Sequence, residues 1–216
     1  MISRRIETVV SEISGNVLAD IGTDHGYIAI EALISRRVSQ AILCDIREGP
    51  LRRAAHNIAI RGLTGCAGTR LGSGLKVLHP NEADCISIAG MGGMLIIEIL
   101  RDGAEVLRSV DKLVLQPQLD IHNVRKFVHS AGFMIVNEHI IYEGRFYTVL
   151  SCKRGSDVEY GTADYMFGKL LIERKDAALK QYLQYRVEEC KKILRGYEAS
   201  EIIKEKRICE EVLACF

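Results

Sequence analysis

The residues with the clearest chemistry lie in one glycine-containing segment near the N-terminus, Asp20-Ile21-Gly22-Thr23-Asp24-His25-Gly26-Tyr27. This segment follows an apolar run and precedes a helical pattern, an arrangement that commonly builds a nucleotide-cofactor pocket. In a dinucleotide fingerprint the middle position is glycine, which lets the backbone approach a pyrophosphate. Here that position is Asp24. Its carboxylate would repel two phosphates but suits a cofactor with a cationic group, such as the sulfonium and ammonium of S-adenosylmethionine.

A second acidic residue, Asp45, ends the next apolar run, nineteen residues after Gly26. An acid at this place can accept hydrogen bonds from both ribose hydroxyls of a nucleoside cofactor. The alternative is that Asp45 caps the following helix. The spacing favours the ribose, although enzymes that use NAD share this feature.

Three later loops also follow apolar runs, and ligands of open α/β sheets bind outside the carboxyl ends of the strands. Residues 71–75 lie where methyltransferases often hold the adenine of the cofactor. Ser73 would accept a hydrogen bond from the adenine amino group only weakly, so a plain turn is an equally good interpretation. The second loop is Ala89-Gly90-Met91-Gly92-Gly93. It lies where a substrate must meet the methyl group of such a cofactor, and its glycines permit close approach of the backbone. Met91 either lines the pocket or packs against neighbouring side chains, and packing is slightly favoured. Gln116-Pro117-Gln118 offers amides that bind a base or make a turn.

Other catalytic classes find little support in the residues. His25 could be a base, a cofactor contact or a helix cap, and a local structural role is favoured. The other five histidines show no metal-ligand spacing, so we expect no metal site. Neither Gly-x-x-x-x-Gly-Lys-Ser/Thr nor Gly-x-Ser-x-Gly occurs, which leaves an NTPase and a hydrolase elbow unsupported.

The elements that must position these residues alternate as strands and helices up to about residue 152. Continuous apolar strands separated by helices predict a parallel sheet covered on both faces. Two later strand-like runs are separated by so few residues that they must pair antiparallel. The expected fold is therefore α/β, a Rossmann-like class I methyltransferase sheet that is mostly parallel and ends in an antiparallel hairpin. The strands are expected at 17–21, 41–46, 69–71, 84–89, 112–115, 133–141 and 146–153, and the helices at 27–35, 48–61, 93–101 and 121–130.

The pattern changes after residue 154, where residues 154–157 read as a linker. Apolar residues between 171 and 194 predict one long amphipathic helix, and residues 201–214 predict a second. We expect a domain over 1–154 that binds the cofactor and a helical, coiled-coil-like hairpin over 155–216. Residues 169–195 contain eight basic and four acidic residues, which suits a polyanion or an ordinary solvated helix face.

Composition limits the remaining classes. The chain has 216 residues, 48% of them hydrophobic, and a formal net charge of +1, enough for one α/β domain and an appendage. Its seven cysteines form no Cys-x-x-Cys pair, which argues against a disulfide framework and a structural zinc site. The first eleven residues lack the apolar stretch of a signal peptide, and no apolar run reaches membrane length. We expect a cytoplasmic protein without a membrane partner. A monomer is favoured, because the C-terminal stripe is too short for a zipper.

Together these motifs resemble the bacterial tRNA (adenine-N1)-methyltransferases that act on adenine 22 of tRNA. The resemblance covers roughly residues 1–153 and is carried by residues 19–27, 45–50, 88–93, 115–117 and 144–147. It implies S-adenosylmethionine as cofactor, tRNA as partner and a C-terminal helical domain that helps to hold the tRNA. Two residues depart from the family pattern. Ser73 stands where the family usually carries Asp, and Gln118 stands where it usually has Asn.

The hypothesis is methyl transfer from S-adenosylmethionine to N1 of adenine 22 in tRNA. The alternatives are a methyltransferase for another RNA or a small molecule, a catalytically weakened RNA-binding homologue, and an NAD-dependent oxidoreductase, which Asp24 disfavours. No side chain is assigned a certain catalytic role, and the candidates are Asp24, Met91 and Gln116. The substrate-binding candidates are Arg4, Arg5, Gln118, Lys191 and Lys192. The residues expected at the cofactor are Asp20, Gly22, Thr23, Asp24, His25, Gly26, Tyr27, Asp45, Ile46, Ser73, Gly74, Ala89, Gly90, Met91 and Gly92.

Overall fold

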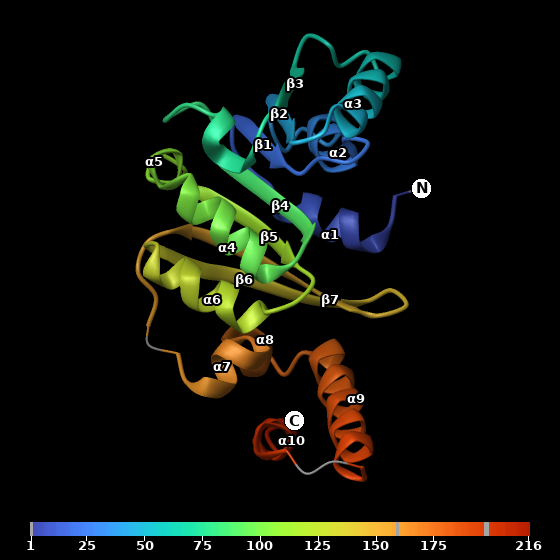
Figure 1. The fold of residues 1–216 in the computed structure, drawn as a ribbon, viewed down its shortest axis with the longest axis vertical. Coiled ribbons are helices and arrows are strands. Elements are labelled where there is room, and N and C mark those ends of the chain that lie inside the picture. The colour runs from blue at the N-terminus through green and yellow to red at the C-terminus, as the bar shows by residue number, and fades with distance from the viewer. Residues whose placement is uncertain (1, 159, 197–198) are drawn as a thin grey trace.

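The fold is built on one seven-stranded sheet in the order β3-β2-β1-β4-β5-β7-β6 (Figure 1). The computed structural model describes residues 2–158, 160–196 and 199–216. The first five strands run parallel, whereas β7 pairs antiparallel with both β5 and β6. This confirms the predicted α/β sheet with a terminal hairpin. The strands are β1 (Val17–Ile21), β2 (Gln40–Asp45), β3 (Ala67–Leu71), β4 (Cys85–Met91), β5 (Lys112–Pro117), β6 (Phe133–Tyr142) and β7 (Phe146–Arg154).

Two hydrophobic layers cover the sheet, one on each face, as continuous apolar strands require. Three helices pack on one face: α1 (Arg4–Glu12), α2 (Tyr27–Ile34) and α3 (Glu48–Ile60). The other face carries the 3-10 turn η1 (Gly74–Val77), α4 (Gly93–Asp102), α5 (Ala104–Leu107) and α6 (Ile121–Ser130). Because every parallel strand ends at the same edge, the loops after β1, β2, β4 and β5 converge there.

Four C-terminal helices form a separate cluster beyond the β6 edge of the sheet (Figure 1). They are α7 (Thr162–Phe167), α8 (Lys169–Glu173), α9 (Ala177–Leu194) and α10 (Ser200–Leu213). The predicted hairpin exists as α9 against α10. The prediction of one helix through residues 171–194 is wrong, because Lys175 adopts a left-handed backbone with φ of 51°. Asp176 then caps a new helix by accepting hydrogen bonds from the backbone N–H groups of Ala178 and Leu179.

A buried ion pair attaches the helical cluster to the sheet. The Nε of Arg125, on α6, lies 2.6 Å from Oε1 of Glu138, on β6, and both side chains are almost fully buried. Arg125 also donates to the carbonyl oxygens of Tyr165 and Met166 on α7, at 2.9 and 3.1 Å. A register shift between Ile135 and Asn137 turns Glu138 toward this face. One guanidinium therefore holds three elements together.

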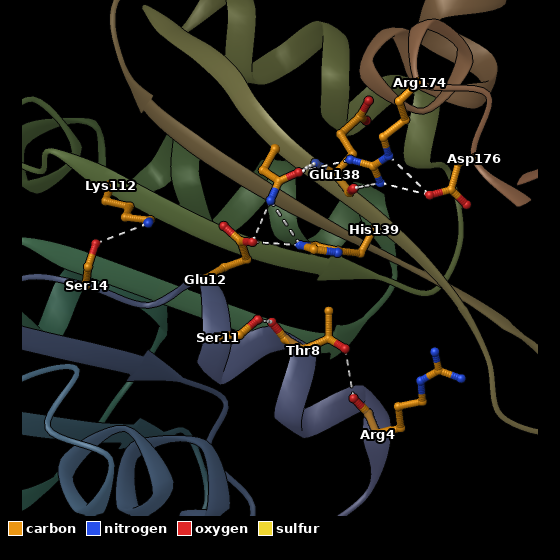
Figure 2. Close-up of polar contacts among 11 residues, drawn as sticks. Arg4, Thr8, Ser11, Glu12, Ser14, Lys112, Glu138, His139, Arg174 and Asp176 are labelled. Carbon is orange, nitrogen blue, oxygen red and sulfur yellow. Dashed lines mark hydrogen bonds and ion pairs between the residues drawn. The ribbon is translucent and has the colours of Figure 1, made fainter. Parts of the chain in front are cut away.

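The helix α1 was not anticipated from the sequence, and a polar cluster fixes it to β6 (Figure 2). The carboxylate of Glu12, at its C-terminal end, lies 2.6 Å from Nε2 of His139 and accepts a hydrogen bond from Asn137 at 2.7 Å. Arg174 donates to the side-chain oxygen of Asn137 and to the main-chain oxygen of Glu138, which extends the cluster toward the C-terminal helices. This cluster fixes the C-terminal end of α1, while Arg5 in its first turn donates to Gln116 at the carboxyl end of β5.

We expect the Glu12 contact to make stability depend on acid pH. The pKa of Glu12 is lowered from 4.5 to about 2, chiefly by the hydrogen bond from His139. A lowered carboxyl pKa contributes stability that is fully present above 4.5 and is lost as the pH falls toward 2, on the order of 3 kcal/mol. Urea unfolding of the wild type and of Glu12→Gln should therefore differ at neutral pH and converge in acid. A difference that stays constant with pH would contradict this assignment.

Candidate functional site

A cavity of about 1240 Å³ opens at the carboxyl edge of the sheet. Its wall comes from the loops after β1, β2, β4 and β5 and from the first turn of α1. A cavity of this size accommodates a nucleoside cofactor. The predicted site residues that line it are Asp20, Gly22, Thr23, Asp24, His25, Tyr27, Asp45, Ala89, Gly90, Met91, Arg5 and Gln118.

The loop after β1 holds a tight, left-handed turn. Its φ angles are 75° at Gly22, 59° at His25 and 73° at Gly26. A Cβ on Gly22 would lie 1.9 Å from Cε of Met91, so the missing side chain lets the two loops meet. The carbonyl of His25 accepts a hydrogen bond from Asn57, and its ring stacks on Tyr27 at 5.4 Å. The main chain of His25 thus helps to hold this turn, and the residue also lines the cavity.

Two buried polar residues, Asp20 and Thr23, line the cavity. Burial raises the pKa of Asp20, against the effect of a hydrogen bond that Ser87 Oγ donates at 2.6 Å and of the nearby Thr23 hydroxyl. That hydroxyl is buried and forms no hydrogen bond of full geometry with a described residue. A desolvated carboxylate gains stability from a cation, and an unpaired buried hydroxyl gains from a hydrogen-bond partner. These residues fit a ligand that carries a cationic polar group, as the ammonium of S-adenosylmethionine does.

Asp24 already has a cationic partner within the protein. Its Oδ1 lies 2.7 Å from Nη2 of Arg53 on α3, and its side chain is 62% exposed. The hydrogen bond from Arg53 is the main reason that the pKa of Asp24 is lowered. Asp24 therefore lies on the rim of the cavity with its charge largely compensated.

Asp45 combines burial with an open position at the cavity. Its side chain is 6% exposed, and Oδ1 accepts a hydrogen bond from the backbone N–H of Arg47 at 2.8 Å. This bond shapes the loop before α3. Arg47 is the N-cap residue of this helix, and its own side chain makes no capping hydrogen bond. Asp45 is thus oriented by the start of the helix and still faces the cavity.

The loops after β4 and β5 are joined by Gln116, a catalytic candidate from the sequence. Its side chain is fully buried and does not line the cavity. Oε1 accepts hydrogen bonds from Nη1 of Arg5 at 2.8 Å and from the N–H of Gly90 at 3.2 Å. Gln116 therefore holds the cavity wall from behind, and Gln118 is the amide of this loop that faces the cavity.

The remaining predicted residues lie outside the cavity lining. Gly26 starts α2, and Gly92 starts α4. Gln116 aside, the others are surface or edge positions. They are Ile46, Ser73 and Gly74 in the loops after β2 and β3, Arg4 at the start of α1, and Lys191 and Lys192 at the end of α9.

Sequence reasoning missed most of the N-terminal wall. Ile2, Ser3, Ile6 and Glu7 line the cavity together with Arg5. The available signal was Ser3, whose hydroxyl accepts a hydrogen bond from the N–H of Ile6 as an N-cap. That pattern predicts a helix start but not where the helix packs.

Neither a metal site nor a membrane-spanning helix is found in the part of the chain that the structure describes. Across residues 2–158, 160–196 and 199–216, no three His, Cys, Asp or Glu side chains gather in a way that could hold a metal ion. Among the helices of these ranges, none has both the length and the apolar character needed to span a bilayer.

Comparison with known proteins identifies a single family. Residues 18–215 match the family model of the tRNA (adenine(22)-N(1))-methyltransferases, TrmK. A Bacillus subtilis (strain 168) protein of that name is 36% identical over 191 residues, which are 85% of this chain and 80% of the relative.

Solved structures agree with this match over the whole chain. The Streptococcus pneumoniae protein Sp1610 in complex with S-adenosyl-L-methionine is 33% identical, with a TM-score of 0.90 and coverage of 99% of this chain and 100% of the other. M. capricolum TrmK in complex with S-adenosyl-homocysteine is 26% identical, with a TM-score of 0.89 and coverage of 100% and 99%.

Proposed function

The chain belongs to the tRNA (adenine(22)-N(1))-methyltransferase family and is a methyltransferase that uses S-adenosylmethionine, and we propose that the cavity at the carboxyl edge binds this cofactor and receives the target base. The reaction is methylation of N1 of adenine 22 in tRNA. The match over residues 18–215 is the observation that carries this conclusion. Nothing in the comparisons favours another substrate, an inactive RNA-binding protein or an NAD enzyme.

We propose that two polar parts of the cofactor, the ribose and the ammonium, bind different acids of the cavity. We assign the ribose hydroxyls to Asp45, which is buried and faces the cavity. The ammonium is assigned to Asp20, whose desolvated carboxylate gains from a cation, with Thr23 as a further partner. Asp24 contributes a negative charge at the rim of the cavity, where it forms an ion pair with Arg53. When bound, the cofactor supplies an electrophilic methyl group.

The chain's own residues act by positioning. Adenine N1 carries a lone pair, so no side chain must serve as nucleophile. Correct alignment alone can supply up to about 7–11 kcal/mol of rate acceleration. We assign this role to the wall made by Gly90, Met91 and Gln118, which Gln116 braces from behind. An oxygen of this wall, such as the side-chain oxygen of Gln118, would stabilise the positive charge that develops on the methylated base.

Two binding and activity measurements test the proposed function. Calorimetry should detect binding of S-adenosylmethionine but not of NAD. If S-adenosylmethionine does not bind, the cofactor assignment is wrong. Methyl transfer should then occur on tRNA with adenine 22 and disappear when that nucleotide is replaced. Undiminished transfer to the altered tRNA would refute the position.

The C-terminal helices are proposed to contact the tRNA backbone. Lys191 and Lys192 lie on α9, each 2.7 Å from a glutamate one turn earlier, Glu188 and Glu189. Exposed pairs of this kind are weak, so both ammonium groups can turn to phosphates.

Replacing Lys191 and Lys192 with alanine should weaken tRNA binding and flatten its salt dependence. Each lost phosphate contact lowers the slope of log K against log salt by about 1. Filter binding across a salt series measures this slope. Lys112→Ala, at the amino end of β5 and away from the site, is the control. An unchanged slope in the double variant would remove α9 from the docking surface.

We make three further proposals, which concern the domains, the oligomeric state and the cellular location of the protein. The chain is proposed to divide into a catalytic domain over 1–154 and a helical domain over 155–216, which is supported by the separate hydrophobic cluster of α7 to α10. A monomer is proposed, and sedimentation would test it. A cytoplasmic location is proposed because tRNA is the substrate, and the seven free cysteines fit a reducing compartment.

A further inference from the structure

Leu119 is an apolar residue in an unusual place. The residue is 68% exposed, which places it with Ile46 and Ile60 among the most exposed large apolar residues of the described ranges. Exposure alone means little, because single apolar side chains are common on protein surfaces. The position of Leu119 gives it significance, since it follows Gln118 in the loop after β5.

This loop lies where two cavities meet. Gln118 lines the cofactor cavity and also a second cavity of about 820 Å³. Leu119 and Asp120 line only the second, which lies between the start of α6 and the C-terminal helices. Leu119 therefore lies directly beside the residue that both cavities share.

The second cavity offers aromatic rings next to Leu119. Tyr165 and Tyr182 are among its lining residues, and its charged residues are Lys126 and Lys204 together with Asp120, Glu201 and Glu205. Aromatic rings stack on unpaired bases, and lysines bind the phosphates. Unpaired bases of the polynucleotide that carries the target base thus have aromatic rings to stack on next to Leu119.

The main chain of Leu119 is held rigidly, although its side chain is exposed. The N–H of Gln118 donates to the carbonyl of Met91 at 2.8 Å, and the N–H of Gly93 donates to the carbonyl of Leu119 at 3.0 Å. A Cβ on Gly93 would lie 2.4 Å from that carbonyl oxygen, so only glycine allows this approach. Asp120 follows with a left-handed φ of 54°. A fixed main chain presents the leucine in one place.

We infer that Leu119 is a wedge that enters the base stack of the tRNA and occupies the space that the target adenine leaves. The inference rests on the proposed function, since only a base-modifying enzyme must extract a base. Extrusion costs a few kcal/mol of stacking and pairing. An apolar side chain that inserts between bases offsets part of this cost, as wedge residues of other nucleic-acid-binding proteins do. Leu119 is therefore a positioning residue that does not touch the reacting atoms.

The experiment compares two tRNA substrates, one intact and one with an abasic site opposite the target adenine. Leu119→Ala should lower kcat/KM on the intact tRNA about tenfold or more, because extrusion loses its support. On the opened tRNA the loss should shrink to about twofold, because unpaired bases leave the stack more easily. Calorimetry should give the same affinity for S-adenosylmethionine as in the wild type. With 2-aminopurine at the target position, the fluorescence increase on binding should be smaller for Leu119→Ala.

A matched control is Ile34→Ala, which removes a 53% exposed side chain of equal size at the far end of α2. It should match the wild type on both substrates. An equal loss by Leu119→Ala on both substrates, or no loss on either, would overturn the wedge. Wild-type protein that methylates neither tRNA would overturn the proposed function, and the inference would fall with it.

Discussion

Replacing Glu138 with alanine is expected to lower the free energy of unfolding by about 3–5 kcal/mol, because it leaves the buried guanidinium of Arg125 without its counter-charge. The two side chains are 0% and 2% exposed, and their ionic atoms are 2.6 Å apart. A loss of this size is a large fraction of the 5–15 kcal/mol by which domains are usually stable. Urea unfolding followed by circular dichroism measures the change.

Two further variants separate the buried charge from general packing. Glu48→Ala breaks an exposed pair with Arg52, in which the side chains are 65% and 81% exposed, and should change stability by less than about 1 kcal/mol. Combining Glu138→Leu with Arg125→Met removes both buried charges and should recover part of the loss. If Glu138→Ala costs no more than Glu48→Ala, the pair does not hold the helical cluster in place.

Replacing Asp45 with asparagine is expected to raise the Kd for S-adenosylmethionine by roughly 10- to 100-fold. Hydrogen bonds to a charged acceptor are worth about 1.5–3 kcal/mol, and each 1.4 kcal/mol is a factor of ten in affinity. Asparagine keeps the shape and the oxygen that accepts from Arg47, so the loop before α3 should persist. Calorimetry measures the affinity, and thermal unfolding without ligand checks the fold.

Asp24→Asn is the matched comparison, because it removes a carboxylate from the same cavity. Arg53 already compensates that charge, and the side chain is 62% exposed. We therefore expect a smaller loss of cofactor affinity than for Asp45→Asn. A larger loss for Asp24→Asn would reverse the two roles and make Asp24 the principal cofactor ligand.

The sheet was predictable because its signals are local. Apolar runs separated by helical patterns predict parallel strands, and the few residues between Ile141 and Phe146 allow only an antiparallel turn. The predicted strands and helices of residues 17–153 exist, with ends that shift by one or two residues. The long C-terminal helix was mispredicted, because an apolar stripe continues across the break at Lys175 without a glycine or proline to mark it.

The candidate site was partly predictable for a related reason. Loops that end parallel strands share one edge of the sheet, so Asp20, Asp45 and Met91 meet in one cavity as expected. The contribution of Arg5 through Gln116 has no local signal, because these residues are 111 positions apart. The partnership of Asp24 with Arg53 also depends on how α3 packs.

The sequence by itself determined the sheet and the glycine turns, since each follows from neighbouring residues whose spacing restricts the backbone. It also predicted a cofactor with a cationic group from the charge of Asp24, which the structure pairs with Arg53. Only the tertiary structure decided which polar residues find partners. The register shift in β6 turns Glu138 toward Arg125 and the next residue, His139, toward Glu12 on the opposite face. One extra residue in a strand reverses the face of every residue after it. The strand's residue types do not reveal such a shift, because long-range packing selects it.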